Sequence, residues 1–161
     1  MKTNVFCIIY ATDGKPYLNY PEVDDKTKNK TLPFALAQMR WNGQLGFTGG
    51  GVEKGEDIKD ALIRELEEEI NLFNIEPSVL EFNHQIEKDD TLTISYKLKV
   101  TYEHLLLIQR ESLNAEHFMA ESVGTLLLPL QNTSSNELEN VLNNNFCYTS
   151  KEELEVLIEN L

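Results

Sequence analysis

The chain has 161 residues, of which 41% are hydrophobic and 25% are charged, and its formal net charge is −13. This composition is typical of a globular domain, and the acidic excess argues against broad nucleic-acid binding, which depends on Lys and Arg. No apolar run approaches the roughly 20 residues of a membrane-spanning helix. Cys7 and Cys147 lie far apart and outside any CxxC pair. We therefore expect one cytoplasmic domain over residues 1–161, with reduced thiols and no membrane partner.

The first quarter of the chain predicts two strands. Residues 4–11 are β-branched and apolar, which favours a first strand over a signal peptide. A polar, turn-rich segment follows over residues 12–33. Residues 34–41 predict a second strand, and Asn42-Gly43 predicts a two-residue hairpin turn to a return strand at 44–47.

Three consecutive glycines, Gly49 to Gly51, follow this hairpin. Glycine costs backbone entropy and offers no side chain to pack, so we expect residues 48–51 to lie outside any strand interior. Such a run suits a backbone that takes unusual dihedral angles or approaches a ligand closely. A flexible loop is the alternative.

The rest of the chain mixes helices with strands. Its content and periodicity predict the following elements: a helix over 57–71, strands over 79–87 and 91–102 joined by a turn at 88–90, a short helix over 103–112, a strand over 122–130, a helix over 134–143 and a last helix that begins after Thr149 or Ser150. This order predicts an α/β fold in which helices cover both faces of a mixed sheet.

The predicted helix over 57–71 carries a dense acidic face. Glu65, Glu68 and Glu69 share one face because they are three and four residues apart, while apolar residues recur every four positions on another face. Like charges at this spacing repel each other. Carboxylates are the ligands that Mg²⁺ and Mn²⁺ prefer, so a divalent cation would offset the repulsion. The alternative is an ordinary solvated acidic face.

The spacing around these glutamates is specific. Five residues separate Gly50 from Glu56, seven more lead to Arg64, and the motif ends at Leu72 as R-E-L-E-E-E-I-N-L. The pattern resembles the Nudix box, G-x5-E-x7-R-E-U-x-E-E-x-G-U with U aliphatic, over residues 50–72. One position departs from it: Asn71 replaces glycine, and Asn tolerates the left-handed conformation of helix ends.

The resemblance to Nudix hydrolases implies a fold, a reaction and a set of roles. The fold would be the Nudix α/β/α sandwich with a mixed β-sheet, and the reaction the metal-dependent hydrolysis of a diphosphate linkage in a nucleotide. Mg²⁺ or Mn²⁺ would be the cofactor. Arg64 would orient Glu65, Glu56 would stabilise the box, and Glu65 or Glu68 would be the general base. The metal ligands would be the Gly50 carbonyl, Glu65, Glu68 and Glu69.

The likeness extends beyond the box. "FALAQMRWNGQLGFTGGGVE", "SVGTLLLPL" and "NNFCYTSKEELEVLI" are similar to segments of the animal Nudix enzymes that decap nucleolar small RNAs and hydrolyse inosine diphosphates. Phe6 stands where those enzymes have a base-contacting histidine, so it would stack without hydrogen-bonding. The resemblance implies that the substrate-binding residues are Phe6, Arg40, Phe47, Gly49 and Glu153.

Two further features have both functional and ordinary interpretations. The segment "SLNAEHFMAESVG" contains Glu116, His117 and Glu121, each a candidate base or extra metal ligand from outside the box. The same residues would also suit a plain surface loop. Trp41, at the predicted hairpin, could stack on a base or pack against the protein.

The substrate expected first is a purine nucleoside di- or triphosphate, which would make the protein a nucleotide-pool cleansing enzyme with a small nucleotide as its partner. The alternatives are hydrolysis of capped RNA, hydrolysis of ADP-ribose or a dinucleoside polyphosphate, and a non-catalytic Nudix-fold binding module. The intact Glu65, Glu68 and Glu69 argue against the last. The resemblance also allows a homodimer.

Overall fold

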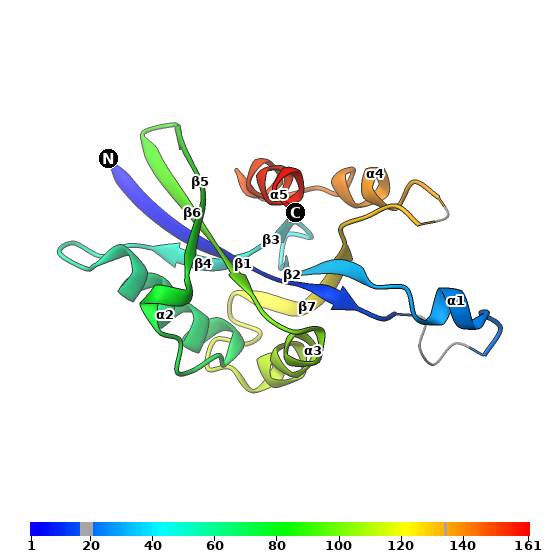
Figure 1. Ribbon diagram of the computed structural model, residues 1–161. Coiled ribbons are helices and arrows are strands. Elements are labelled where there is room, and N and C mark those ends of the chain that lie inside the picture. Colours follow the sequence, from blue (N-terminus) through cyan, green and yellow to red (C-terminus); the bar gives the residue numbers. More distant parts are fainter. Residues whose placement is uncertain (17–20, 134) are drawn as a thin grey trace.

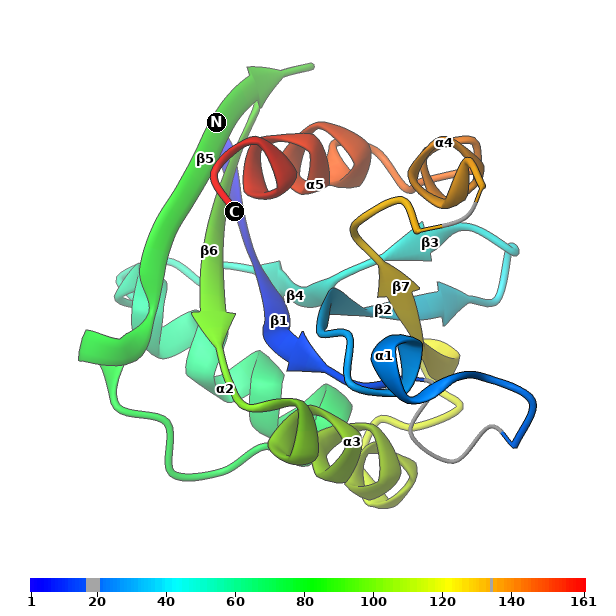
Figure 2. The same ribbon diagram turned by 45° about the vertical axis from the view of Figure 1, so that its right-hand side comes forward.

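A mixed seven-stranded sheet runs through the centre of the molecule between two layers of helices (Figures 1 and 2). The structure is a computed structural model that describes residues 1–16, 21–133 and 135–161. The strands are β1 (Lys2–Gly14), β2 (Leu32–Arg40), β3 (Leu45–Gly46), β4 (Thr48–Gly51), β5 (Glu81–Lys88), β6 (Thr91–Lys99) and β7 (Ser122–Pro129). The helices are α1 (Asp25–Lys28), α2 (Ile58–Ile70), α3 (Tyr102–Glu111), α4 (Glu137–Leu142) and α5 (Ser150–Glu159), with 3-10 turns at Pro77–Val79 and Ser112–Asn114.

Strand β1 organises the sheet because it has different partners along its two edges. One edge pairs in parallel with β6 from Lys2 to Tyr10. The other edge is shared: its first part, Asn4 to Cys7, pairs antiparallel with β4, and its later part, from Ile9, pairs antiparallel with β2. Strand β2 then diverges to pair with β3 and β7. The sheet therefore forks between β2 and β4.

The two faces of the sheet carry separate hydrophobic cores. Alternate residues of β1 point to opposite faces. Val5, Cys7 and Ile9 pack with the apolar stripe of α2 and with α3, while Ile8 and Tyr10 pack with α4 and α5. This arrangement confirms the predicted α/β/α sandwich with a mixed sheet.

Helix α2 lies within one residue of its predicted bounds, because residues next to the helix determine where it begins and ends. The Asp57 side chain accepts hydrogen bonds from the backbone N–H groups of Lys59 and Asp60, as an N-cap does. At the other end Asn71 adopts the left-handed conformation, with φ 60° and ψ 30°. Asparagine is one of the few residues that take this conformation readily.

Other predicted elements are confirmed with shifted ends. The turn between β5 and β6 has positive φ at Asp89 and Asp90, the pattern of a tight two-residue hairpin. The helix predicted over 134–143 is α4, which begins at Glu137; position 134 lies outside the described residues. Helix α5 begins at Ser150 as expected.

Two expectations near the glycines were wrong. Residues 48–51 do form a strand, β4, because pairing with β1 overrides the low strand propensity of glycine. The hairpin after β2 is not a two-residue turn at Asn42-Gly43. Its central residues are Trp41 and Asn42, since the Gly43 N–H donates to the Arg40 carbonyl, and Gly43 follows with φ 83°. This is the three-residue hairpin that ends in a glycine bulge.

In the described part of the chain, no helix is long and apolar enough to cross a membrane. Cys7 and Cys147 are both free thiols, and Cys7 is buried in the core. The single-domain boundary and the homodimer stay predictions.

Candidate active site

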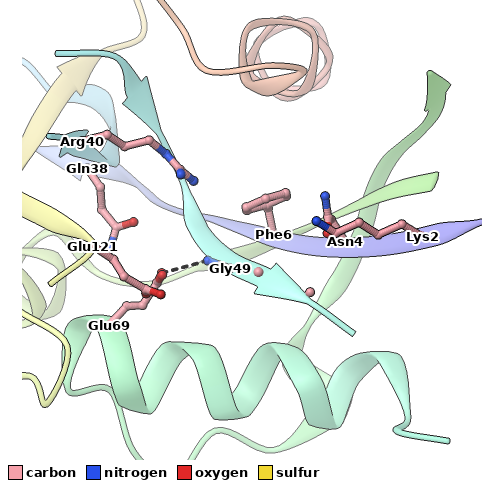
Figure 3. Close-up of a pocket in the computed structure, with 10 residues that line it drawn as sticks. Lys2, Asn4, Phe6, Gln38, Arg40, Gly49, Glu69 and Glu121 are labelled. Atoms are coloured by element: carbon pink, nitrogen blue, oxygen red, sulfur yellow. Dashed lines mark hydrogen bonds between the residues drawn. The ribbon is translucent and has the colours of Figure 1, made fainter. Parts of the chain in front are cut away.

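A pocket of about 330 Å³ lies at the fork between β2 and β4 (Figure 3). Residues from five parts of the chain meet there: the start of β1, the end of β2, the β4 glycines, α2, and the segment before β7, the last two each with one acidic side chain. The lining residues are Lys2, Asn4, Phe6, Gln38, Arg40, Gly49, Gly50, Gly51, Glu69 and Glu121. Its volume lies at the lower end of the range for small-molecule sites.

The glycines of β4 allow α2 to approach the sheet closely. Gly49 has φ 153°, and a Cβ there would lie 2.0 Å from the Val5 carbonyl oxygen. A Cβ on Gly50 would lie 2.6 Å from Oε1 of Glu65. No side chain fits at either position, so strand and helix can bring backbone and carboxylates together at the pocket. The glycine run thus takes an unusual backbone conformation at Gly49, as predicted, although within a strand, and its close approach to a ligand stays a prediction.

Three carboxylates converge beside these glycines. Glu65 and Glu69 of α2 and Glu121 each offer one oxygen, and these three oxygens lie within 4.8 Å of one another. The Gly49 N–H donates to Oε2 of Glu69 over 3.0 Å, which fixes this carboxylate against β4. We call Glu65, Glu69 and Glu121 the acidic triad.

Glu69 forms no ion pair with a basic side chain among the described residues, whereas Glu65 pairs with Arg64 and Glu121 lies near His117. Burial raises the pKa of Glu69 to about 9, and hydrogen bonding to Glu121 and its negative charge add to the rise. Burial is also the main cause that raises the pKa of Glu65, against the lowering effect of Arg64. Crowded, partly desolvated oxygens of this kind fit a hard divalent cation, which would supply the missing positive charge. The triad can therefore hold Mg²⁺ or Mn²⁺.

Arg64 supports the triad from the solvent side. Its Nε and NH2 group bind the Glu56 carboxylate, at 3.0 and 3.1 Å, and its NH1 group binds Oε1 of Glu65 at 2.9 Å. The NH2 group also donates to the Gly51 carbonyl over 3.3 Å. Arg64 thus ties α2 to β4 and holds Glu65 by an ion pair, while the functional roles of Arg64 and Glu56 stay predictions.

Glu68 does not belong to the acidic triad. Its Oε2 lies 3.5 Å from NH1 of Arg64 and 3.6 Å from Nδ1 of His117. The His117 Nδ1 atom also lies 3.8 Å from Oε2 of Glu121, so His117 stands between the two carboxylates. The backbone N–H of His117 donates to the Glu68 carbonyl over 2.9 Å. This bond anchors the segment that carries Glu121 to the end of α2. Glu116 is exposed on the outer side of α2.

The opposite wall of the pocket carries hydrogen-bond donors. The Arg40 side chain forms no hydrogen bond or ion pair with any described residue, and its Nε is buried. Its guanidinium packs over Gly46, where a Cβ would lie 3.1 Å from Nε. Half-buried Phe6 lies along β1 between Arg40 and the chain start. A guanidinium without a carboxylate partner, in so acidic a protein, indicates an anionic ligand.

Two residues predicted to bind substrate lie away from this pocket. Phe47 is 1% exposed and packs in the core beneath α5. Glu153 of α5 is also 1% exposed, and its Oε1 accepts a hydrogen bond from the Thr149 hydroxyl over 2.7 Å. Burial raises the Glu153 pKa to about 7. Their substrate contacts stay predictions, as do the roles of the other site residues.

The sequence analysis missed Gln38, which lines the pocket and is only 5% exposed. A single glutamine in a strand produces no pattern that could have singled it out. It also left Glu121 unseparated from Glu116 and His117, because only the tertiary structure shows which of them reaches Glu65 and Glu69.

Comparison with known structures supports the fold. A MutT/Nudix family protein from Listeria innocua superposes with a TM-score of 0.66 and 16% identity, covering 99% of this chain and 92% of that one. MutT from Aliivibrio salmonicida and Vibrio cholerae gives a TM-score of 0.59 at 17% identity, with 99% and 98% covered.

Comparison with known sequences identifies the family. The U8 snoRNA-decapping enzyme of the insect Homalodisca vitripennis is 41% identical over 131 residues, which are 77% of this chain and 64% of that enzyme, slightly under two thirds of its length. The enzyme of the same name from Mus musculus is 29% identical over 133 residues, 78% of this chain and 68% of that enzyme. The family model described as Nudt16-like, U8 snoRNA-decapping enzyme-like, matches residues 3–161. The chain therefore belongs to the Nudt16-like family of the Nudix superfamily.

Proposed function

We propose that this protein hydrolyses the diphosphate linkage of capped RNA with the help of Mg²⁺ or Mn²⁺. The acidic triad carries the hydrolytic part of the proposal. Its three carboxylate oxygens are crowded together, and two of its members, Glu69 and Glu121, line a pocket whose opposite wall presents Arg40, a side chain without a partner among the described residues. The family match supports capped RNA as the substrate, since the relatives above are named as decapping enzymes. This order reverses the expectation from sequence, which placed free purine nucleotides first.

The acidic triad would hold the cation, with the neighbouring Gly50 carbonyl as a further ligand. When bound, a divalent cation neutralises the diphosphate and lowers the pKa of the attacking water. Arg64 keeps Glu65 in place through the 2.9 Å contact. Glu68, next to the triad and held by Arg64 and His117, is our candidate for the general base that accepts the proton of water.

The substrate would lie between the two walls of the pocket. One phosphate would face the acidic triad, and another would pair with Arg40, whose planar guanidinium suits bidentate contacts to phosphate oxygens. Phe6 presents an aromatic side chain to the same pocket, where it would stack on a base. The chain would thus orient the diphosphate and leave charge neutralisation to the cation.

Free nucleoside di- and triphosphates are the second candidate substrates, and two observations favour them. The net charge of −13 opposes the binding of a long RNA strand. A cavity of about 330 Å³ is also small for more than one nucleotide. If RNA is the substrate, only its capped end would enter.

A substrate panel with Mg²⁺ or Mn²⁺ tests the proposal. It would contain a short capped RNA, inosine and guanosine di- and triphosphates, ADP-ribose and a dinucleoside polyphosphate. We expect release of the cap nucleotide and complete dependence on the cation. Turnover of free nucleotides but not of capped RNA would favour the alternative function, a nucleotide-pool cleansing enzyme. No turnover of any substrate by protein that binds Mn²⁺ would indicate a non-catalytic binding module.

A further inference from the structure

Gln38 is a buried polar side chain whose amide N–H group lacks a hydrogen-bond partner among the described residues. It lies on β2 and is 5% exposed. An unsatisfied buried donor costs free energy, and such groups are rare in native proteins. Because Gln38 lines the pocket, a ligand could satisfy this group.

The surroundings of Gln38 define what this ligand would be. Gln38 and Arg40 are two residues apart on β2, so they share one face of the strand. The Gln38 side chain points toward the carboxylates of Glu69 and Glu121, as Figure 3 shows, while Arg40 reaches along the neighbouring strand. Gln38 therefore stands between the acidic triad and the unpaired guanidinium.

An uncharged amide fits this position better than a charged side chain. A lysine or arginine here would repel a cation held by the acidic triad, and a carboxylate would repel a phosphate group that bridges the triad and Arg40. An amide N–H donates to phosphate oxygen without opposing the cation. The Gln38 amide and the Arg40 guanidinium, which belong to side chains that line the pocket, are together suited to a polyphosphate.

We propose that Gln38 binds the substrate by donating a hydrogen bond from Nε2 to a non-bridging oxygen of the phosphate that faces the acidic triad. This inference rests on the proposed function, because it assumes a diphosphate substrate. It assigns Gln38 the task of fixing that phosphate between the cation and Arg40, in the orientation that in-line attack requires.

The test compares Gln38→Met with Gln85→Met. Methionine nearly conserves the volume of glutamine but donates no hydrogen bond. Gln85 is exposed on β5, two strands away from β1, and does not line the pocket, so it controls for the substitution itself. We would measure steady-state kinetics, Mn²⁺ affinity by titration, binding of guanosine 5′-diphosphate to the Mn²⁺-loaded protein by calorimetry, and thermal unfolding without metal.

For Gln38→Met we expect a loss of about 10- to 100-fold in kcat/KM and in guanosine diphosphate affinity, as for a hydrogen bond to a charged group. Mn²⁺ affinity should stay within about twofold, since the amide does not ligate the ion. The midpoint of thermal unfolding should stay equal or rise, because an unsatisfied buried donor is removed. Gln85→Met should match the wild type throughout.

Unchanged diphosphate binding and kinetics in a folded Gln38→Met protein would overturn the proposal, as would a wild-type protein that fails to bind guanosine diphosphate. A loss of Mn²⁺ affinity equal to the loss of diphosphate affinity would also overturn it and place Gln38 in the metal site. The outcome is separable from the proposed function. If the wild type binds the diphosphate through Gln38 but does not cleave capped RNA, the RNA proposal fails and the phosphate contact stands.

Discussion

Two glutamates, one in each helical layer, are buried against the same sheet. They show that burial and crowding by other carboxylates have different effects on the pKa of a carboxyl group. Glu69 of α2 is 9% exposed and has a pKa raised to about 9, whereas Glu153 of α5 is only 1% exposed and has a pKa raised to about 7. The more exposed side chain thus has the higher pKa. Glu153 is stabilised by the Thr149 hydroxyl, while Glu69 also meets the charge of Glu121. The pKa of Glu153 is raised mainly by burial, with a smaller contribution from the charge of Glu152, whereas Glu69 is buried and also converges with other carboxylates, which gives a site for a cation.

The largest expected effect comes from removing the charge of Glu69. In Glu69→Gln we expect cation-dependent hydrolysis to fall by more than the roughly 10- to 100-fold that loss of an outer partner of a metal site costs, because the substitution removes a proposed direct ligand. Mn²⁺ affinity, measured by titration, should fall in parallel.

Glu67→Gln is the matched control, since Glu67 lies on the same helix outside the triad. It should leave Mn²⁺ affinity unchanged. If Glu69→Gln bound Mn²⁺ as tightly as the wild type, Glu69 would not be a cation ligand. Glu69 and Glu153 would then differ only in how deeply they are buried.

Gly50→Ala perturbs the same face more gently. The new methyl group would lie 2.6 Å from Oε1 of Glu65, so it should displace this carboxylate from the triad. We expect kcat/KM to drop by about 10- to 100-fold with the fold retained, as when the support of a metal ligand is lost.

Gly51→Ala serves as the neighbouring control, because the nearest atom to its new methyl group would be Oδ1 of Asn4 at 4.0 Å, an ordinary contact. Equal losses of activity in the two variants would show that β4 tolerates no side chain at all. The specific link between Gly50 and Glu65 would then be unsupported.

Glu153→Gln tests the other face through the pH dependence of stability. The pKa of Glu153 is higher in the folded protein than in the unfolded chain, so its contribution to stability is complete below pH 4.5 and is lost as the pH rises to about 7. The loss amounts to roughly 3 kcal/mol at most. The glutamine variant should therefore unfold at higher denaturant concentration than the wild type at pH 8, with a smaller difference at pH 5.

Urea titrations at the two pH values measure this difference, with Glu159→Gln, an exposed position at the end of α5, as the control. A variant that loses stability at pH 8 would show that the ionised Glu153 carboxylate has a partner that the present contacts do not include.

The smallest expected effect concerns Trp41, which follows the pocket residue Arg40 in sequence but does not itself line the pocket. Trp41 is 61% exposed, but its Nε1–H donates to the Met119 carbonyl over 2.9 Å, which holds the indole in place beside Arg40. A fixed, exposed aromatic ring suits stacking on a base of RNA outside the pocket. We expect Trp41→Ala to weaken turnover of capped RNA about fivefold while free nucleoside diphosphates are turned over as before. Equal losses for both substrates would assign Trp41 to the pocket wall, through its bond to the segment that carries Glu121.

The parts of the structure that could be predicted from sequence are those with local causes. Helix α2 follows from the Asp57 cap, the Asn71 end and the apolar stripe between them, and the β5–β6 hairpin follows from two turn-forming aspartates. Strand β4 could not be predicted, since its glycines are favoured only by contacts with β1 and α2.

The site divides in the same way. Glu65 and Glu69 are close because they are four residues apart on a helix. The positions of Glu121 and Gln38, by contrast, depend on how β2 and the segment before β7 pack against α2. Phe47 differs from both cases. The family resemblance suggested that it contacts a ligand, whereas in the structure its side chain is enclosed between the sheet and α5.

The backbone bond from His117 to Glu68 has a consequence for biogenesis. The chain emerges with the first two carboxylates of the triad on α2, but the third arrives only after β5, β6 and α3 have been made and the later segment has docked on the end of α2. Contacts so distant in sequence form late in folding, because closing a long loop costs entropy. A nascent or truncated chain would therefore lack the complete acidic triad. Tight binding of the cation would then distinguish completely folded molecules from incompletely folded ones.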